Sequence, residues 1–214
     1  LVFFFVGCSD SKIQQEEDYI FGTIIGIKIY GETKIKAEKV STEIFNEFHR
    51  LHKLLHPWEE SLITKINHAI SKNKSIVINN EEVILILQDI KKLETQTQTY
   101  FNPAIGKLIK LWGFHSNDFN QKIIPEKKEI KRLVLSNPSM NSITINNKIL
   151  KSSNENVQID LGGYAKGYAL DQAKKILTKN NIKNALVNIG GNILAFGKNG
   201  ERYWKVGIQH PRKP

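Results

Sequence analysis

The chain has 214 residues, of which 40% are hydrophobic and 24% are charged, so it can form a globular protein with a substantial core. Lysine and arginine outnumber the acidic residues by 31 to 21, which gives a formal charge of +10. The basic residues are spread along the chain without regularly interleaved aromatics, so nucleic acid is not an expected partner. The single cysteine excludes an internal disulfide.

The first eight residues, "LVFFFVGC", form an apolar run that ends in Cys8. This pattern resembles the tail of a bacterial lipoprotein signal, in which the cysteine is lipidated, and the run is too short to span a bilayer. Polar residues follow, as in a flexible tether. We therefore expect residues 1–19 to be a signal remnant and tether with a membrane anchor at Cys8; a buried cysteine after a short strand is the alternative.

Three elements are expected in the first half of the chain. Residues 21–31 are rich in β-branched side chains between glycines and predict a strand. Residues 41–57 predict a helix with Ser41 or Thr42 as its cap and Pro57 at its end. Residues 79–97 predict a second helix, with an asparagine cap and glutamates in its first turn.

The second half predicts hairpins and one more helix. Residues 142–152 predict a hairpin that turns at Asn146-Asn147, and residues 163–180 have helical apolar spacing. Residues 184–197 predict two strands that meet at a pair of glycines, and residues 202–211 predict another strand. This order of elements indicates an α+β fold with mixed or antiparallel sheets layered with helices.

The segment "DLGGYAKG" combines groups that suit an anion. Asp160 ends a short extended run, and Gly162 and Gly163 permit a sharp turn and a close approach of the backbone. The helix that follows points free N–H groups and a positive dipole at the turn, and Lys166 adds a full charge. A phosphate site and a plain strand–turn–helix joint are both compatible with this pattern.

Two other groups of residues are weaker candidates. His49, His52 and His56 recur at helical spacing, as metal ligands do, but they flank an apolar stripe and are better explained as a solvated flank. Ser61 lacks a G-x-S-x-G context, so a serine hydrolase is not expected.

The segments "DLGGYAKGYALDQAKKIL" and "NALVNIGGNILAFG" resemble the ApbE-like family of FAD:protein FMN transferases. The blocks "FGTIIGIKIYG", "LHPWEESLITKIN" and "YFNPAIGKLIKLWGF" resemble upstream family blocks in the same order. The resemblance covers about residues 20–212 and implies one ApbE-like (T-fold-like) domain over residues 20–214. The family's later metal-binding blocks do not occur before Pro214, so the domain is expected to lack its C-terminal part.

The resemblance implies a reaction. FAD is cleaved at its pyrophosphate in the presence of Mg²⁺, FMN is attached through a phosphoester to a threonine or serine of an acceptor flavoprotein, and AMP leaves. A non-catalytic FAD-binding lipoprotein and an FAD pyrophosphatase are the alternatives. Together with the Cys8 anchor, the resemblance implies the bacterial cell envelope, at the periplasmic face of the inner membrane.

The resemblance also implies the residues of the site. Gly163 is expected to offer its carbonyl to Mg²⁺, a cation that prefers oxygen. Trp112 and Phe114 are expected in the core, and Asn102 stands where family members commonly carry aspartate. The residues expected to contact FAD are Phe21, Trp58, Tyr100, Phe101, Asn102, Asp160 and Lys166.

Overall fold

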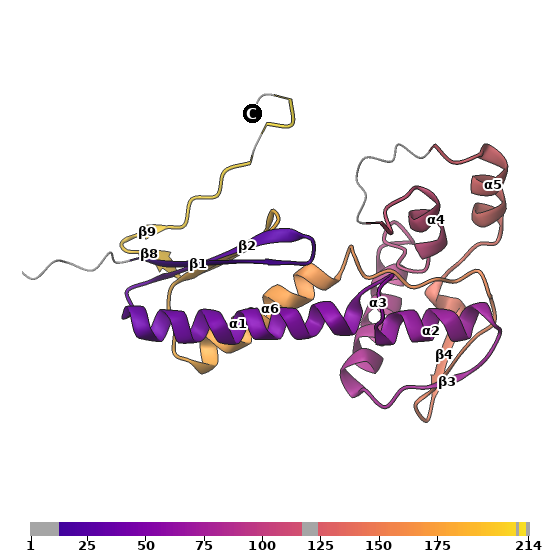
Figure 1. The fold of residues 1–214 in the computed structure, drawn as a ribbon, viewed down its shortest axis with the longest axis horizontal. Helices are drawn as coiled ribbons and strands as arrows, with labels where there is room; N and C mark the ends of the chain where they lie inside the picture. The colour runs from indigo at the N-terminus through magenta and orange to yellow at the C-terminus, as the bar shows by residue number, and fades with distance from the viewer. Residues whose placement is uncertain (1–12, 117–123, 209, 213–214) are drawn as a thin grey trace, which may run out of the picture. The chain divides into compact units, whose positions relative to one another are not determined.

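The structure is a computed structural model that describes residues 13–116, 124–208 and 210–212 (Figure 1). Cys8 lies outside these residues. The chain divides into two compact units. The first unit comprises Leu1–His52 and Lys166–Pro214, and the second comprises Lys53–Ala165.

The first unit is built on a four-stranded antiparallel sheet in the order β1-β2-β6-β7. The strands span Ile13–Ile20 (β1), Thr23–Tyr30 (β2), Ala185–Ile189 (β6) and Asn192–Phe196 (β7). Alternate side chains of a strand point to the same side of a sheet. The side chains that β2 and β6 direct to one of these sides are buried. The buried residues of these two strands are Ile25, Ile27, Ile29, Ala185, Val187 and Ile189.

Strand β1 corrects the expected tether. Every residue from Ile13, opposite Tyr30, to Ile20, opposite Thr23, pairs with β2. The strand is an edge strand with Gln15 and Glu17 exposed on one face, so its sequence reads as polar although its backbone is paired. A tether through residues 13–19 is therefore excluded.

Helices α1 (Lys34–Leu55) and α6 (Ala165–Lys179) complete the core of the first unit, below β1 and β2 in Figure 1. The α6 helix confirms the helix predicted over 163–180. The α1 helix begins earlier than predicted: the Lys36 N–H donates to Thr33 Oγ1 at 3.4 Å, and Ser41 is buried inside the helix. The buried apolar residues of the two helices in this unit include Ile44, Phe48, Leu51, Ala169, Ala173 and Leu177.

The C-terminal part of the first unit is less regular than expected. The glycine pair Gly190-Gly191, with φ of +52° and +94°, joins β6 to β7 and confirms the predicted hairpin. The strand predicted over 202–211 is reduced to Arg202–Tyr203 (β9), which pairs with Lys198–Asn199 (β8). Residues 204–208 have no regular secondary structure, so the β-rich composition of this stretch does not form a longer strand.

The second unit combines helices with a small three-stranded sheet in the order β3-β5-β4. The helix predicted over 79–97 is confirmed as α3, and Asn80 Oδ1 caps it by accepting from the Val83 N–H at 2.9 Å. The predicted hairpin turns one residue later than expected, at Asn147 (φ 48°) and Lys148 (φ 66°). The elements are Leu62–Ser71 (α2), Ile76–Val77 (β3), Glu81–Gln96 (α3), Gly106–Leu111 (α4), Lys127–Leu135 (α5), the 3-10 turn Met140–Ser142 (η1), Ile143–Asn146 (β4) and Ile149–Ser152 (β5).

The α+β class expected from the sequence is therefore confirmed, with antiparallel pairing in each of the sheets formed by the described residues. Across the same residues, no helix is both long enough and apolar enough to cross a membrane.

Candidate functional site

The extended segment 157–160 of the second unit carries Asp160 to its position. The Asp160 N–H donates to the Pro103 carbonyl at 2.8 Å. On the preceding residue, the amide of Asn67 donates to the Ile159 carbonyl at 2.8 Å and accepts from the Ile159 N–H at 2.7 Å. This pair of hydrogen bonds replaces a neighbouring strand, so the segment is held although it is not part of a sheet.

Gly106, at the start of α4, lets the backbone approach this segment closely. Its N–H donates to the Gln158 carbonyl at 2.7 Å, and Ile105 forms an isolated parallel bridge with Gln158. A Cβ at position 106 would lie 2.6 Å from the Gln158 carbonyl oxygen, closer than real Cβ atoms come. Position 106 therefore requires glycine for space.

The carboxylate of Asp160 is bonded on both oxygens. Oδ1 accepts from the Gly162 N–H at 2.7 Å, and Oδ2 lies 2.6 Å from His115 Nε2. Because a carboxylate only accepts, His115 carries its hydrogen on Nε2. The two side chains are 7% and 1% exposed, so the pair is shielded from water.

His115 is the site residue that the sequence analysis missed, since it lies in a loop 45 residues before Asp160. Its ring stacks on the Trp58 indole, with centroids 5.2 Å apart and planes inclined by 25°. The described residues offer no hydrogen-bond partner to its buried Nδ1. The expected pocket residue Trp58 thus lies against a buried imidazole and remains 39% exposed.

His56 also contacts Trp58. Its ring meets Trp58 edge to face at 4.6 Å, and its Nδ1 accepts from the Glu59 N–H at 2.9 Å. Burial lowers the pKa of His56, and the nearby His115 lowers it further, while Glu59 and Asp160 partly oppose both effects. His56 is only 7% exposed, so the expectation of a solvated flank is wrong for this histidine.

The other two histidines of that group have different surroundings. His49 Nε2 lies 2.8 Å from Asp18 Oδ2 and is half exposed, in keeping with a solvated position. The His52 ring packs edge to face on Phe21 at 5.5 Å. Among the described residues, no group of three or more histidines, cysteines and acids is arranged to hold a metal ion.

The turn between Asp160 and α6 brings Gly163 close to Phe101. A Cβ on Gly163 would lie 3.4 Å from Phe101 Cε2, and one on Gly162 would lie 3.0 Å from Asp160 Oδ1. Neither glycine has a positive φ. These positions therefore favour glycine because a side chain would lack space, and not because the backbone conformation is unusual. The Tyr164 hydroxyl donates to Asp89 Oδ2 at 2.7 Å and ties the turn to α3.

Phe21 and Lys166 belong to the first unit, whereas the other predicted site residues belong to the second. Lys166 is the second residue of α6, which confirms its place in the first helical turn. Phe21 forms the β1–β2 turn with Gly22, at φ of 55° and 70°. A bulky residue rarely adopts this conformation, and contacts of its ring with Phe48 and His52 accompany it.

The remaining predicted residues divide by exposure. Tyr100 is 94% exposed, so its ring is open to a ligand. The Asn102 amide donates to the Pro138 carbonyl at 2.9 Å and accepts from the Ala104 N–H at 2.9 Å. An aspartate could not make the first of these bonds, which gives a local reason for asparagine here.

Trp112 and Phe114 are 46% and 70% exposed, so the expectation that they are core residues is wrong.

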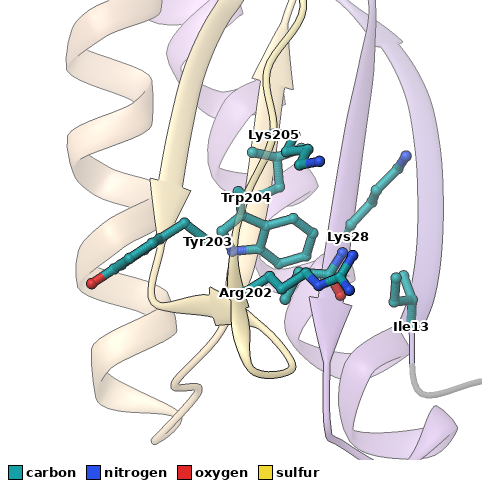
Figure 2. Close-up of a pocket in the computed structure, with 8 residues that line it drawn as sticks. Ile13, Lys28, Arg202, Tyr203, Trp204 and Lys205 are labelled. Atoms are coloured by element: carbon teal, nitrogen blue, oxygen red, sulfur yellow. The ribbon is translucent and has the colours of Figure 1, made fainter.

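A pocket of about 300 Å³ in the first unit includes no predicted site residue in its lining. Figure 2 shows the Trp204 indole in its middle, with Lys28, Arg202 and Lys205 around it and Tyr203 directed away. The indole is held by a bond from its N–H to the Phe196 carbonyl at 3.2 Å. A second pocket of about 290 Å³ is lined by residues of α3, η1 and β4 and likewise includes no predicted site residue.

Comparison with known proteins identifies the relatives of this chain. The chain is 32% identical to a FAD:protein FMN transferase of Rhodobacter capsulatus over 196 residues, which are 92% of this chain and 37% of the relative. It is 28% identical to a FAD:protein FMN transferase of Klebsiella pneumoniae over 207 residues, 95% of this chain and 60% of the relative. The crystal structure of an ApbE protein from Thermotoga maritima superposes with a TM-score of 0.82 at 29% identity, covering 94% of this chain and 64% of that one.

The chain therefore spans less than two thirds of the length of each of these relatives. The model of the ApbE family matches residues 21–214. The expected resemblance and the α+β architecture are thus both confirmed. This chain belongs to the ApbE family.

Proposed function

We propose that this chain carries the FAD-binding part of a FAD:protein FMN transferase. The match of the ApbE family to residues 21–214 is the observation that carries the proposal, because relatives that share this span have that name. In the reaction, an acceptor threonine or serine oxygen forms a bond to the FMN phosphorus. The bond from that phosphorus to the oxygen bridging to AMP breaks, and AMP leaves with the bridging oxygen. The hydroxyl proton is released.

Two features of the second unit fit a flat flavin ring. Trp58 keeps part of its indole exposed while His115 supports the ring, and aromatic faces prefer such offset stacking. Phe101 lies beside Gly163, where the absence of a Cβ leaves room for its ring next to the turn. These residues would bind and orient FAD.

A positive charge suits the diphosphate of FAD. Lys166 lies in the first turn of α6, where the helix dipole and an ammonium both favour an anion. Charge neutralisation of this kind stabilises the transition state of phosphoryl transfer. We therefore assign Lys166 to the diphosphate.

We extend the proposal to Mg²⁺, with the Gly163 carbonyl as one ligand. A carbonyl oxygen is a suitable donor for this hard cation, which would neutralise phosphate charge. Asp160 has both oxygens bonded, and the described residues contain no acidic or histidine cluster able to complete the set. These residues alone therefore do not fit a magnesium centre, and no step is assigned to the ion.

Localisation is a separate part of the proposal. We assign lipidation to Cys8, because it ends an apolar run followed by polar residues, and place the protein at the periplasmic face of the bacterial inner membrane. A labelled fatty acid should be incorporated into the protein in cells and lost from a Cys8→Ala variant. Equal labelling of both proteins would contradict the anchor.

The activity can be tested with FAD, Mg²⁺ and an acceptor protein bearing a threonine. A fluorescent acceptor band in a gel supports transfer, AMP and FMN without that band support a pyrophosphatase, and FAD binding without products supports a flavin-binding protein. A Lys166→Ala variant should lose about tenfold in FAD affinity or turnover, the value of one hydrogen bond to a charged group. Lys174→Ala, on the exposed surface of the same helix, is the matched control.

Absence of FAD binding by the wild-type chain would contradict the proposed function. Wild-type behaviour of Lys166→Ala would remove that residue from the site and leave the assignment of the family intact.

A further inference from the structure

We propose that a basic pocket in the first unit contacts the membrane and binds the phosphate headgroups of anionic phospholipids. The pocket has a volume of about 300 Å³, and its cations are Lys28, Arg202 and Lys205. It surrounds the Trp204 indole (Figure 2). The proposal goes beyond flavin transfer and needs no FAD. It takes the source of the phosphate from the proposed lipidation of Cys8.

The pocket lies on the face of the four-stranded sheet that does not belong to the core. Ile27 and Ile29 of β2 are fully buried, so Lys28, which lies between them, points to the opposite face of the sheet. Leu186 of β6 pairs with Lys28 and lines the same pocket. The core that α1 and α6 complete is on the other side of the sheet, so it does not cover the pocket.

The three cations have no anionic partner within the described part of the protein. Lys28, Arg202 and Lys205 form no ion pair and no side-chain hydrogen bond with another described residue. No acid belongs to the described lining, and Glu17 of β1 and Glu201 of the β8–β9 turn are exposed outside it. Three like charges that lack a counterion attract an anion from outside the protein.

Trp204 adds an aromatic ring in the middle of these charges. Its N–H donates to the Phe196 carbonyl at 3.2 Å, so the indole is held in place before a ligand arrives. Tyr203, directed away from the pocket in Figure 2, is 77% exposed. Tryptophan and tyrosine are enriched where proteins meet lipid headgroups, because their rings are apolar with one polar end. The composition of the pocket therefore matches the interface of an anionic membrane.

The start of β1 connects this pocket to the proposed lipid anchor. Ile13 is the first residue of β1 and lines the pocket. A fully extended chain covers at most about 3.5 Å per residue, so the steps from Cys8 to Ile13 span at most about 17 Å. A lipid at Cys8 would thus bring the pocket close to the headgroups. A basic surface beside an anchor is the second signal that holds one face of a protein against a membrane.

The test uses the full chain with Cys8→Ala, so that no lipid anchor contributes. Co-sedimentation measures the Kd for vesicles of phosphatidylcholine alone and for vesicles with equal parts of phosphatidylcholine and phosphatidylglycerol. The pocket variant is Lys28→Gln/Arg202→Gln/Lys205→Gln in the same background. Circular dichroism and thermal melting check that each protein is folded.

The matched control is Lys39→Gln/Lys174→Gln/Lys175→Gln. It removes the same number of positive charges from exposed positions of α1 and α6. The two triple variants therefore have the same net charge, and a difference between them reports where on the first unit the vesicle binds.

We expect the pocket variant to bind the anionic vesicles about tenfold more weakly than the parent or worse, since each basic residue near a charged membrane contributes roughly a fivefold factor. The control should lose less than about threefold, because this attraction falls off within a Debye length. All three proteins should bind pure phosphatidylcholine equally. If the pocket variant does not fold, Lys28→Gln and Lys205→Gln are measured singly, each with an expected loss of about threefold or more.

Trp204 reports the contact directly. With Trp58→Phe and Trp112→Phe it is the sole tryptophan of the chain. Its emission should move to shorter wavelength on addition of the anionic vesicles, and brominated phosphatidylcholine in those vesicles should quench it. Salt should reverse both changes, because it screens the attraction between the cations and the headgroups.

Several results would overturn the proposal. Equal losses in the two triple variants would mean that net charge, and not this pocket, binds the vesicles, and vesicle binding without a change in Trp204 emission would exclude the pocket as the contact. A Trp204 response to poly-glutamate or to inorganic phosphate, with none to vesicles, would assign the pocket to an acidic protein or to a free anion. If Cys8 is not acylated in cells while the expected vesicle pattern is found, the anchor fails and the membrane contact stands.

Discussion

The two units satisfy their polar groups in different ways. Of the buried polar residues among the described parts of the chain, only Ser41 lies in the first unit, whereas His56, Ser61, Glu94, Ser152 and Asp160 lie in the second. The first unit keeps its ion pairs at the surface, as between Lys179 and Glu43, whose side chains are 74% and 34% exposed. The second unit places acids and imidazoles inside.

The difference follows from the backbone of each unit. Strands of the first unit pair along their length, so the sheet itself satisfies N–H and C=O groups and the core needs only apolar side chains. In the second unit, irregular segments at 101–106 and 157–164 rely on side chains such as Asn67 and Asn102. Single polar substitutions should therefore cost more in the second unit.

The largest expected effect comes from filling the space at Gly106. Gly106→Val would place side-chain atoms against the Gln158 backbone, 2.6 Å from the Cβ position. We expect a loss of about 3 kcal/mol in the free energy of unfolding, the upper range for overpacking. Gly26→Ala is the counterpart in the first unit, where a Cβ meets nothing within 4 Å, and should change stability by less than about 0.5 kcal/mol. Similar losses in urea titrations of both variants would contradict the contrast.

A buried carboxylate should matter more than an exposed one. Glu94 is fully buried on α3, and its Oε2 accepts from the Met140 N–H at 2.9 Å and the Ser139 hydroxyl at 3.1 Å. Glu94→Ala should cost about 2 kcal/mol by leaving that N–H unpaired, and Glu94→Gln should cost less because an oxygen remains.

The matched variant in the first unit is Glu43→Ala, which breaks the surface pair with Lys179. It should cost less than about 0.5 kcal/mol, the usual value of an exposed ion pair. Chemical denaturation measures the loss in the free energy of unfolding for each variant. Equal losses for Glu94→Ala and Glu43→Ala would show that burying a carboxylate does not make the second unit more sensitive than the first.

Acidification should destabilise the second unit through His56. Burial lowers the pKa of this histidine in the folded protein, so the unfolded chain binds more protons as the pH falls through about 6.5. Stability should therefore decrease in that range, and His56→Gln should flatten the decrease in melting temperature between neutral and mildly acidic pH. His68→Gln, at an exposed position, should leave the pH dependence of the melting temperature unchanged. A flattened pH dependence in that variant would mean that the net charge of the protein, and not the burial of His56, causes the effect.

The smallest effect should be a stabilisation at the β4–β5 turn. Lys148 has a φ of 66°, a conformation that costs a non-glycine residue energy. Lys148→Gly should raise the free energy of unfolding by about 0.5 kcal/mol, the relief of backbone strain less the entropy that glycine loses on folding. A lower melting temperature in this variant would mean that the lysine side chain supports the hairpin.

Local patterns in the sequence determined several elements correctly. The Asn80 cap and the apolar spacing after it predict α3, the pair Gly190-Gly191 predicts the β6–β7 hairpin, and Lys166 lies in the first turn of α6 as expected. Each of these signals lies within a few residues of the structure it specifies, because caps, turns and helical periodicity are local properties of the chain.

Only the tertiary structure decided the partners of distant residues. The polar strand β1 is recognisable by its pairing with β2, and the triad of Trp58, His115 and Asp160 joins segments up to about one hundred residues apart. A hydrogen bond or a ring stack between distant segments produces no periodic pattern in the sequence, because it involves only one residue from each segment. For this reason the sequence alone does not indicate His115 as a partner of Asp160, whereas the fold shows what the carboxylate holds within the protein.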